Sequence, residues 1–179
     1  MNSRAVTGII LVSATLLITL GSISGCQNGL PVNQVITGEV TKVHDGDSIH
    51  ITPDGRDRVI IRLAAIDAPE ITQDHGIQSR DYLRGLILNQ PAKAHCNKKD
   101  RYSRQVCRVT TASDDEVDIN LEMLKAGKAW YFTRFKDEQS RSLQRSYRKA
   151  ETSARRKHLG LWRSGSSIPP WEFRSQANN

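Results

Sequence analysis

Residues 35–66 read VITGEVTKVHDGDSIHITPDGRDRVIIRLAAI, and this stretch decides the fold class. Apolar and polar residues alternate along it, which is typical of strands with one buried face. Two turn signals, His44-Asp45-Gly46-Asp47 and Pro53-Asp54-Gly55, interrupt the alternation. The pattern therefore predicts a β-meander of three strands, over residues 35–43, 48–52 and 58–66.

The rest of the chain adds two strands and three helices. Helical periodicity is visible over 76–88, and two β-rich runs at 92–96 and 105–111 flank a turn. Asp118 can cap a short helix that ends at Gly127. The last helix is predicted over 137–158, with acidic residues in its first turn and basic residues in its last. We therefore expect an α+β, mainly β fold: a five-stranded OB-type barrel with three packed helices.

The first 26 residues have the character of an export signal. Arg4 is their only charged residue, and the apolar run that follows is too short for a confident transmembrane helix. Ser24-Gly25-Cys26 resembles a bacterial lipobox, in which the cysteine carries lipid, although Ile23 stands where Leu is usual. The alternative is an ordinary secretory signal cut near Ser24. We expect a lipid anchor on Cys26 that holds an exported protein to the bacterial cell envelope and membrane.

These features predict the domain organisation. A signal peptide with a lipobox-like end covers 1–26, and a linker covers 27–34. The folded domain covers 35–163, and a loosely structured polar tail with docking aromatics covers 164–179. We see no internal repeat, and we expect a monomer.

The chain is basic, with a formal net charge of +7 and a pI of about 9.6. Such a charge favours an anionic partner, such as nucleic acid, a membrane surface or an acidic polymer. Many basic proteins bind no polyanion, however, so charge alone does not identify the partner.

Carboxylates and arginines gather in three short stretches: Asp45-Gly46-Asp47-Ser48, Arg62-Leu63-Ala64-Ala65-Ile66-Asp67-Ala68-Pro69-Glu70 and Asp100-Arg101-Tyr102-Ser103-Arg104. Pro69 stiffens the second stretch, so that it presents two carboxylates from a rigid turn. Carboxylate and carbonyl oxygens suit Ca²⁺ or Mg²⁺ rather than Zn²⁺. Phosphodiester hydrolysis needs such an ion, a group that positions water, and guanidinium groups for the phosphate charge.

In this order and spacing, the three stretches resemble the motifs of the staphylococcal nuclease (thermonuclease) family. The similarity runs from about residue 35 to residue 162, and the Pro-Pro-Trp-Glu-Phe tail is similar to that of some exported bacterial members. The resemblance implies an OB-type barrel and a calcium-dependent endonuclease. Such an enzyme cleaves DNA and RNA with little sequence specificity and leaves 3′-phosphates.

The resemblance also implies a role for individual residues. Asp47, Asp67 and the backbone carbonyl of Ala68 match the calcium ligands. Glu70 matches the group that orients or deprotonates water. Arg62 and Arg104 match the phosphate-binding arginines, and Tyr102 and Tyr131 are the candidates for the nucleotide site.

Ser103 departs from the family pattern, which has glycine at this position. If the position requires a positive φ, Ser103 strains the turn that aims Arg104. Cys96 and Cys107 are equidistant from residues 101–102, so a two-residue hairpin loop would place them opposite each other. We therefore predict a Cys96–Cys107 disulfide that stiffens this hairpin.

Other interpretations remain open at this point. Some family members have lost catalytic side chains and only bind nucleic acid, and the chain is otherwise interpretable as a basic lipoprotein that touches anionic lipid. The basic residues of the last helix are either a solvated face or an attraction for polyphosphate. The five histidines form no metal-ligand pattern: His44, His50, His75, His95 and His158.

Overall fold

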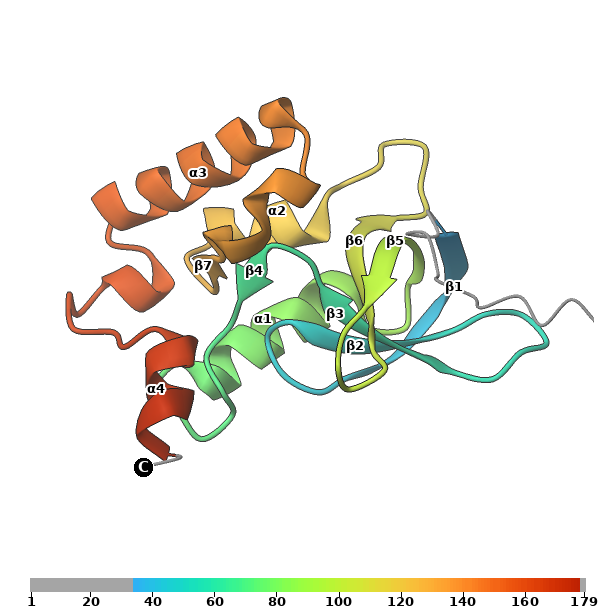
Figure 1. Ribbon diagram of the computed structural model, residues 1–179, viewed down its shortest axis with the longest axis horizontal. Helices are drawn as coiled ribbons and strands as arrows, with labels where there is room; N and C mark the ends of the chain where they lie inside the picture. The colour runs from blue at the N-terminus through green and yellow to red at the C-terminus, as the bar shows by residue number, and fades with distance from the viewer. Residues whose placement is uncertain (1–33, 178–179) are drawn as a thin grey trace, which may run out of the picture.

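Five strands close into a small barrel, in the computed structural model that describes residues 34–177 (Figure 1). Around the barrel the order is β1-β2-β3-β6-β5, and only the β3–β6 pair is parallel. The predicted fold class is thereby confirmed. The barrel strands are β1 (Gln34–Val43), β2 (Ser48–Thr52), β3 (Val59–Leu63), β5 (Pro91–Lys99) and β6 (Gln105–Thr111).

The apolar residues of the alternating pattern fill the interior of the barrel. Ile49 and Ile51 of β2 are fully buried, as are Ile61 of β3 and Val109 of β6. Branched aliphatic side chains pack well on a pleated surface, and their burial supplies most of the stabilisation of such a core.

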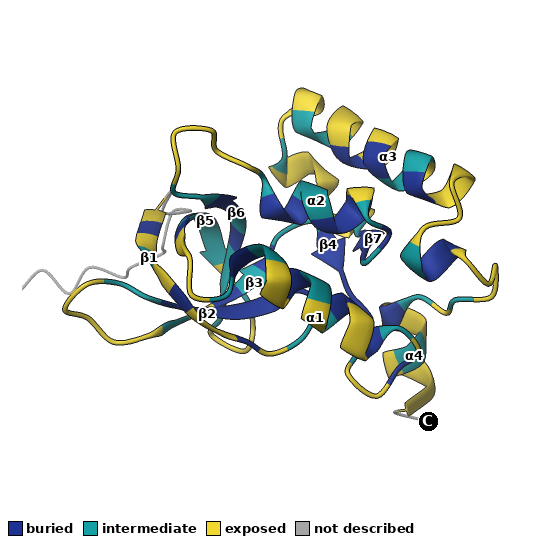
Figure 2. Ribbon diagram, turned by 180° about the vertical axis from the view of Figure 1, so that it is seen from behind, coloured by how far each residue is buried: buried dark blue, intermediate teal, exposed yellow. Residues whose placement is uncertain are grey.

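Within residues 34–177, four α-helices accompany the barrel: α1 (Gly76–Ile87), α2 (Ile119–Lys125), α3 (Arg141–Arg156) and α4 (Pro170–Ala177). Their buried positions turn toward the molecule, as on α1, α2 and α3 in Figure 2. Two short 3₁₀ helices, η1 (Thr133–Glu138) and η2 (Gly160–Trp162), flank α3 in the chain. A small antiparallel pair, β4 (Ile66–Asp67) with β7 (Trp130–Tyr131), lies between the barrel and α3.

The last long helix begins later than we expected. Its N-cap is Ser140, whose side chain accepts a hydrogen bond from the backbone N–H of Leu143 at 3.3 Å. The acidic residues at 137–138 belong to η1 instead of to the first turn of α3. The predicted strand over 58–66 is also interrupted, because Ala65 adopts a left-handed φ of 59° between β3 and β4.

The C-terminal tail is more ordered than we expected. Residues 170–177 form α4, and the ring of Trp171 lies 5.7 Å from that of Phe132 and 6.5 Å from that of Trp130. These contacts place the end of the chain beside β4 and β7, at the edge of the candidate site.

The β5–β6 hairpin differs from the predicted two-residue loop. Lys99 pairs with Gln105, so the loop spans residues 100–104, and the register shifts between Cys96 and Lys98. This bulge brings Cys96 opposite Cys107, and a disulfide joins them. The predicted pairing therefore occurs with a longer loop and a compensating bulge.

Residues 1–33 lie outside the described part of the chain, and with them the predicted signal, the lipid site at Cys26 and most of the linker. Gln34, the last residue of the predicted linker, already belongs to β1. Within residues 34–177, no helix is long and apolar enough to cross a membrane.

Candidate active site

The turn between β1 and β2 fixes Asp47 rigidly. The backbone N–H of Asp47 donates to Asp45 Oδ1 at 2.9 Å, and Asp47 Oδ2 accepts from the N–H of Ala68 at 2.8 Å. Ser48 Oγ donates to Asp47 Oδ1 at 3.0 Å, and Asp47 is only 6% exposed. Gly46 is required here, because a Cβ on it would stand 2.0 Å from Ser79 Oγ. The turn therefore holds one buried carboxylate in a single orientation.

Arg62 links this turn to β4. It points from β3 so that its Nη1 lies 2.6 Å from Asp47 Oδ2 and its Nη2 lies 2.9 Å from Asp67 Oδ1. Asp67 is 1% exposed at the end of β4. One guanidinium thus pairs with two carboxylates that are 20 residues apart in sequence. Its hydrogen bonds to charged oxygens are stronger and more directional than those between neutral groups.

Glu70 stands at the open side of this cluster, after the turn that contains Pro69. Its side chain is 37% exposed, so water reaches it. A residue that sequence reasoning missed lies against it: Arg174 of α4 places Nη1 2.7 Å from Glu70 Oε1 and Nη2 2.7 Å from Asp67 Oδ2. The only sequence signal for this residue was its place just after the Pro-Pro-Trp-Glu-Phe run.

Arg104 approaches the same cluster from the β5–β6 loop. Asp100 holds it, because Asp100 Oδ2 accepts from Arg104 Nε at 2.7 Å while Oδ1 accepts from the N–H groups of Tyr102 and Arg104. Arg104 Nη1 donates to Ser48 Oγ at 3.3 Å, which is itself bonded to Asp47. Asp100 belongs to the third motif, but the motif alone does not predict this role.

Tyr102 and Ser103 form the tip of this loop. Tyr102 is 63% exposed, and its ring lies 4.8 Å from the guanidinium of Arg101 and 5.4 Å from that of Arg104. Ser103 has a φ of 63°, the left-handed conformation that favours glycine. The condition for strain at Ser103 is therefore met.

Tyr131 lies differently from the other site candidates. It is 5% exposed, packs edge-on against Tyr147 at 5.8 Å between ring centroids, and donates its hydroxyl to Gln139 Oε1 at 2.9 Å. Its side chain has little surface left for a nucleotide, and its role at the nucleotide site stays a prediction.

Burial and mutual repulsion shape the electrostatics of the carboxylates. Desolvation and the neighbouring charge of Asp47 raise the pKa of Asp45 to about 7. Burial also raises the pKa of Asp67, although the hydrogen bond from Arg174 opposes the shift. The pKa of Asp100 is lowered: its burial is outweighed by the hydrogen bonds from Arg104. Burial, with the charge of Asp47 as a smaller cause, therefore disfavours the ionised forms of Asp45 and Asp67.

The oxygen donors fit a hard divalent cation. Asp47, Asp67 and the carbonyl of Ala68 are the groups that would hold Ca²⁺, and all three residues are buried. Among the described residues, no three His, Cys, Asp or Glu side chains converge as closely as metal ligands do. Guanidinium groups stand between the carboxylates instead: Arg62 between Asp47 and Asp67, and Arg174 between Asp67 and Glu70.

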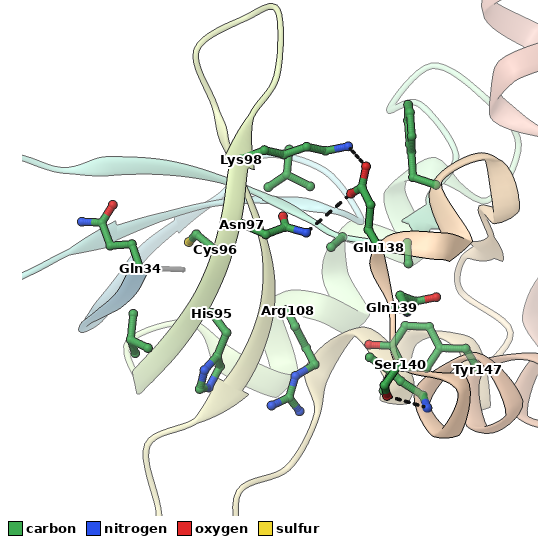
Figure 3. A pocket seen from close by; sticks show the side chains of 16 residues that line it. Gln34, His95, Cys96, Asn97, Lys98, Arg108, Glu138, Gln139, Ser140 and Tyr147 are labelled. Atoms are coloured by element: carbon green, nitrogen blue, oxygen red, sulfur yellow. Dashed lines mark hydrogen bonds and ion pairs between the residues drawn. The ribbon is translucent and has the colours of Figure 1, made fainter. Parts of the chain in front are cut away.

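A separate cavity lies away from this cluster. It has a volume of about 310 Å³ and opens between β5–β6 and the segment that leads from η1 into α3 (Figure 3). Ion pairing between Lys98 and Glu138 borders it, and Tyr147 lies on its helical side. Of the predicted site residues only Cys96 lines it, so the cavity is not the candidate active site.

Comparison with known proteins identifies the family of the chain. The family model described as staphylococcal nuclease homologue matches residues 60–164. An uncharacterized endonuclease of Escherichia coli O157:H7 is 33% identical over 139 residues, which cover 78% of this chain and 85% of the relative. One of Haemophilus influenzae is 32% identical over 168 residues, covering 94% and 85%. A micrococcal nuclease of Shigella flexneri is 32% identical over 148 residues, covering 79% and 82%. The chain therefore belongs to the staphylococcal nuclease family.

Proposed function

We propose that this protein is a calcium-dependent nuclease that hydrolyses phosphodiester bonds of DNA and RNA. Its family and the endonuclease names of its relatives support nuclease activity. The observation that carries the proposal is the convergence of two arginines on one carboxylate: Arg62 bonds Asp47 directly, and Arg104 reaches it through Ser48 Oγ. A phosphate placed there meets two fixed guanidinium groups beside the oxygen donors for a cation.

Each residue of the site has a different role in the proposed reaction. Glu70, which water reaches, accepts a proton from the attacking water or orients it. Arg62 and Arg104 donate hydrogen bonds to the phosphate oxygens, where negative charge grows in the transition state. A bound Ca²⁺ supplies Lewis-acid polarisation of the phosphate. By the family resemblance, the 5′ P–O bond breaks and 3′-phosphates are released, with little sequence preference.

The proposal extends to location and assembly. We propose that the protein is exported, works as a monomer, and is held to the bacterial envelope by lipid on Cys26. The N-terminal pattern of residues 1–26 is what supports this placement. Mass spectrometry of the envelope-extracted protein tests it: an unmodified Cys26, or a mature chain that does not begin at Cys26, contradicts the anchor.

A binding module without catalysis is the second candidate, because some family members have lost catalytic side chains. The presence of the five side chains Asp47, Arg62, Asp67, Glu70 and Arg104 in one connected cluster favours the enzyme.

Nucleotide release from denatured DNA and from RNA decides between the two. It is measured for the full chain with Ca²⁺, with a chelator, and for Glu70→Gln, beside Glu39→Gln as a control at an exposed carboxylate of β1. We expect calcium-dependent release that Glu70→Gln lowers roughly 10²- to 10⁴-fold and Glu39→Gln leaves unchanged. Binding of nucleic acid without any release would establish the binding module.

A further inference from the structure

The C-terminal helix α4 is anchored against the active site by contacts outside it. Trp171 packs on Phe132 and Trp130, and Gln73 Nε2 donates to the carbonyl of Ile168 at 2.5 Å just before the helix begins. Pro170, the first residue of α4, is buried. In Figure 1, α4 lies beside the start of α1 and below β4. The helix is therefore docked where it can present a side chain to the carboxylates.

Arg174 is that side chain. One of its guanidinium nitrogens bonds Asp67 Oδ2, and the other bonds Glu70 Oε1 and also Asp67 Oδ1, at 2.7, 2.7 and 3.3 Å. The guanidinium thus fills the space between a proposed metal ligand and the proposed water-orienting group.

The two arginines that bond Asp67 differ in how firmly they are held. The side chain of Arg62 is 16% exposed and projects from a barrel strand, whereas that of Arg174 is 43% exposed and belongs to the last helix. Partly exposed ion pairs are screened by water and are weak, so the pair made by Arg174 is the easier to release. Arg174 engages both oxygens of Asp67, so a metal ion bound by this carboxylate would stand directly beside a second positive charge.

We infer that Arg174 is a resident cation that a divalent metal ion must displace from Asp67 and Glu70, so that α4 lowers the metal affinity of the active site. The inference rests on the proposed metal-dependent function. In the metal-free protein, Arg174 balances the carboxylates and stabilises the fold. Because any group that favours the metal-free state opposes metal binding by the same free energy, removal of this group tightens binding.

Calcium titration by calorimetry on the full chain, without nucleic acid, tests the inference. Arg174→Gln removes the resident cation, and Arg141→Gln removes an equal charge from the exposed start of α3 as the control. We expect the dissociation constant for Ca²⁺ to fall roughly fivefold or more in Arg174→Gln, the scale of an exposed ion pair. Arg141→Gln is expected to leave it unchanged.

Two further measurements separate displacement from a loss of folding. Trp171→Ala weakens the docking of α4 while keeping Arg174, and it is expected to tighten Ca²⁺ binding in the same direction. In the unmodified protein, hydrogen–deuterium exchange of residues 170–177 is expected to rise when Ca²⁺ is added. Melting in chelator is expected to show Arg174→Gln less stable than the parent, with the difference shrinking in Ca²⁺.

The outcomes distinguish this inference from the proposed function. A calcium-dependent nuclease whose Ca²⁺ affinity is unchanged or weakened by Arg174→Gln overturns the inference and leaves the function standing. Absence of Ca²⁺ binding in both the parent and Arg174→Gln overturns both.

Discussion

Asp100 is a positioning residue for Arg104. Its carboxylate accepts from Arg104 Nε at 2.7 Å and from two backbone N–H groups of the same loop, so one side chain shapes the turn and aims the guanidinium. Asp100→Asn keeps a side-chain acceptor for the backbone but loses the charge that holds Arg104. We expect the turnover of denatured DNA to fall roughly 10- to 100-fold, because small misplacements of an active-site group have large effects on rate.

A double-mutant cycle checks this prediction. If Asp100 acts only through Arg104, the variant carrying both Asp100→Asn and Arg104→Ala is no slower than Arg104→Ala alone. Asp114→Asn, at an exposed aspartate of the loop after β6, serves as the control. If the fold-reductions in turnover of the two single variants multiply in the double variant, the positioning role is contradicted.

Ser103 carries local backbone strain at the tip of the same loop. With a φ of 63°, it occupies a conformation in which a branched Cβ is costly. We expect Ser103→Val to lower the free energy of unfolding by about 1–2 kcal/mol. Ser103→Gly relieves the strain but adds freedom to the unfolded chain, so its net effect is expected to stay within about 1 kcal/mol. Urea unfolding measures both, and equal stabilities for the Val and Gly variants would argue against strain.

At the scale of elements, a hydrogen bond from a buried tyrosine joins α3 to the start of α2. Tyr147 is 1% exposed, and its hydroxyl donates to both oxygens of Asp118, the N-cap of α2, at 3.0 and 3.1 Å. Tyr147→Phe is expected to lower the free energy of unfolding by about 1.5–3 kcal/mol, the range for hydrogen bonds to charged groups. Urea unfolding at pH 8 measures it, with Tyr102→Phe at an exposed ring as the control.

The same contact predicts a dependence on pH. Burial and the charge of Asp118 raise the pKa of Tyr147 above its usual value, so the folded state holds this proton more tightly than the unfolded chain does. Its contribution is complete below the unfolded pKa of about 10 and is lost as the pH rises above it. The stability difference between the parent and Tyr147→Phe should therefore shrink above pH 10, and a constant difference would contradict the assignment.

Elements that follow from local pattern were predictable, and those that depend on docking were not. The alternation of apolar and polar residues predicted the barrel strands, because the buried face of a strand shows in residues that are close in sequence. The predicted start of α3 was wrong. Acidic residues at 137–138 resemble those of a first helical turn, but the helix begins after its N-cap, Ser140. The tail was expected to be loose, because the contacts that order α4 come from Phe132 and Trp130, far away in sequence.

For the whole molecule, the sequence motifs identified most of the site residues but not the contacts between them. Asp47, Arg62 and Asp67 were all singled out from the sequence, and the barrel brings them into direct contact. Asp100 and Arg174 were missed as partners, since a sequence motif does not state which guanidinium meets which carboxylate. Arg174 in particular lies 107 positions from Asp67 in the sequence, so only the folded chain reveals their contact.

The overall charge of +7 raises the question of which basic side chains would contact nucleic acid. The exposed face of α3 carries a cluster of basic residues around a shallow hollow, but α3 lies across β4–β7 from α4 in both views (Figures 1 and 2). Screening limits its influence to about 8–10 Å at physiological salt. Arg101, by contrast, stacks on Tyr102 in the loop that carries Arg104, at 4.8 Å from the ring centroid.

We therefore expect the salt dependence of binding to come from the loop and not from α3. Single-stranded DNA binding is measured across about 50–200 mM salt in a Glu70→Gln background, where we expect cleavage to be suppressed. Arg101→Gln is expected to reduce the slope of log affinity against log salt by about 0.7, the value for one phosphate contact on a single strand. The triple change Arg145→Gln, Arg148→Gln and Lys149→Gln should leave the slope unaltered. A larger reduction from the triple variant than from Arg101→Gln would instead place the bound strand along α3.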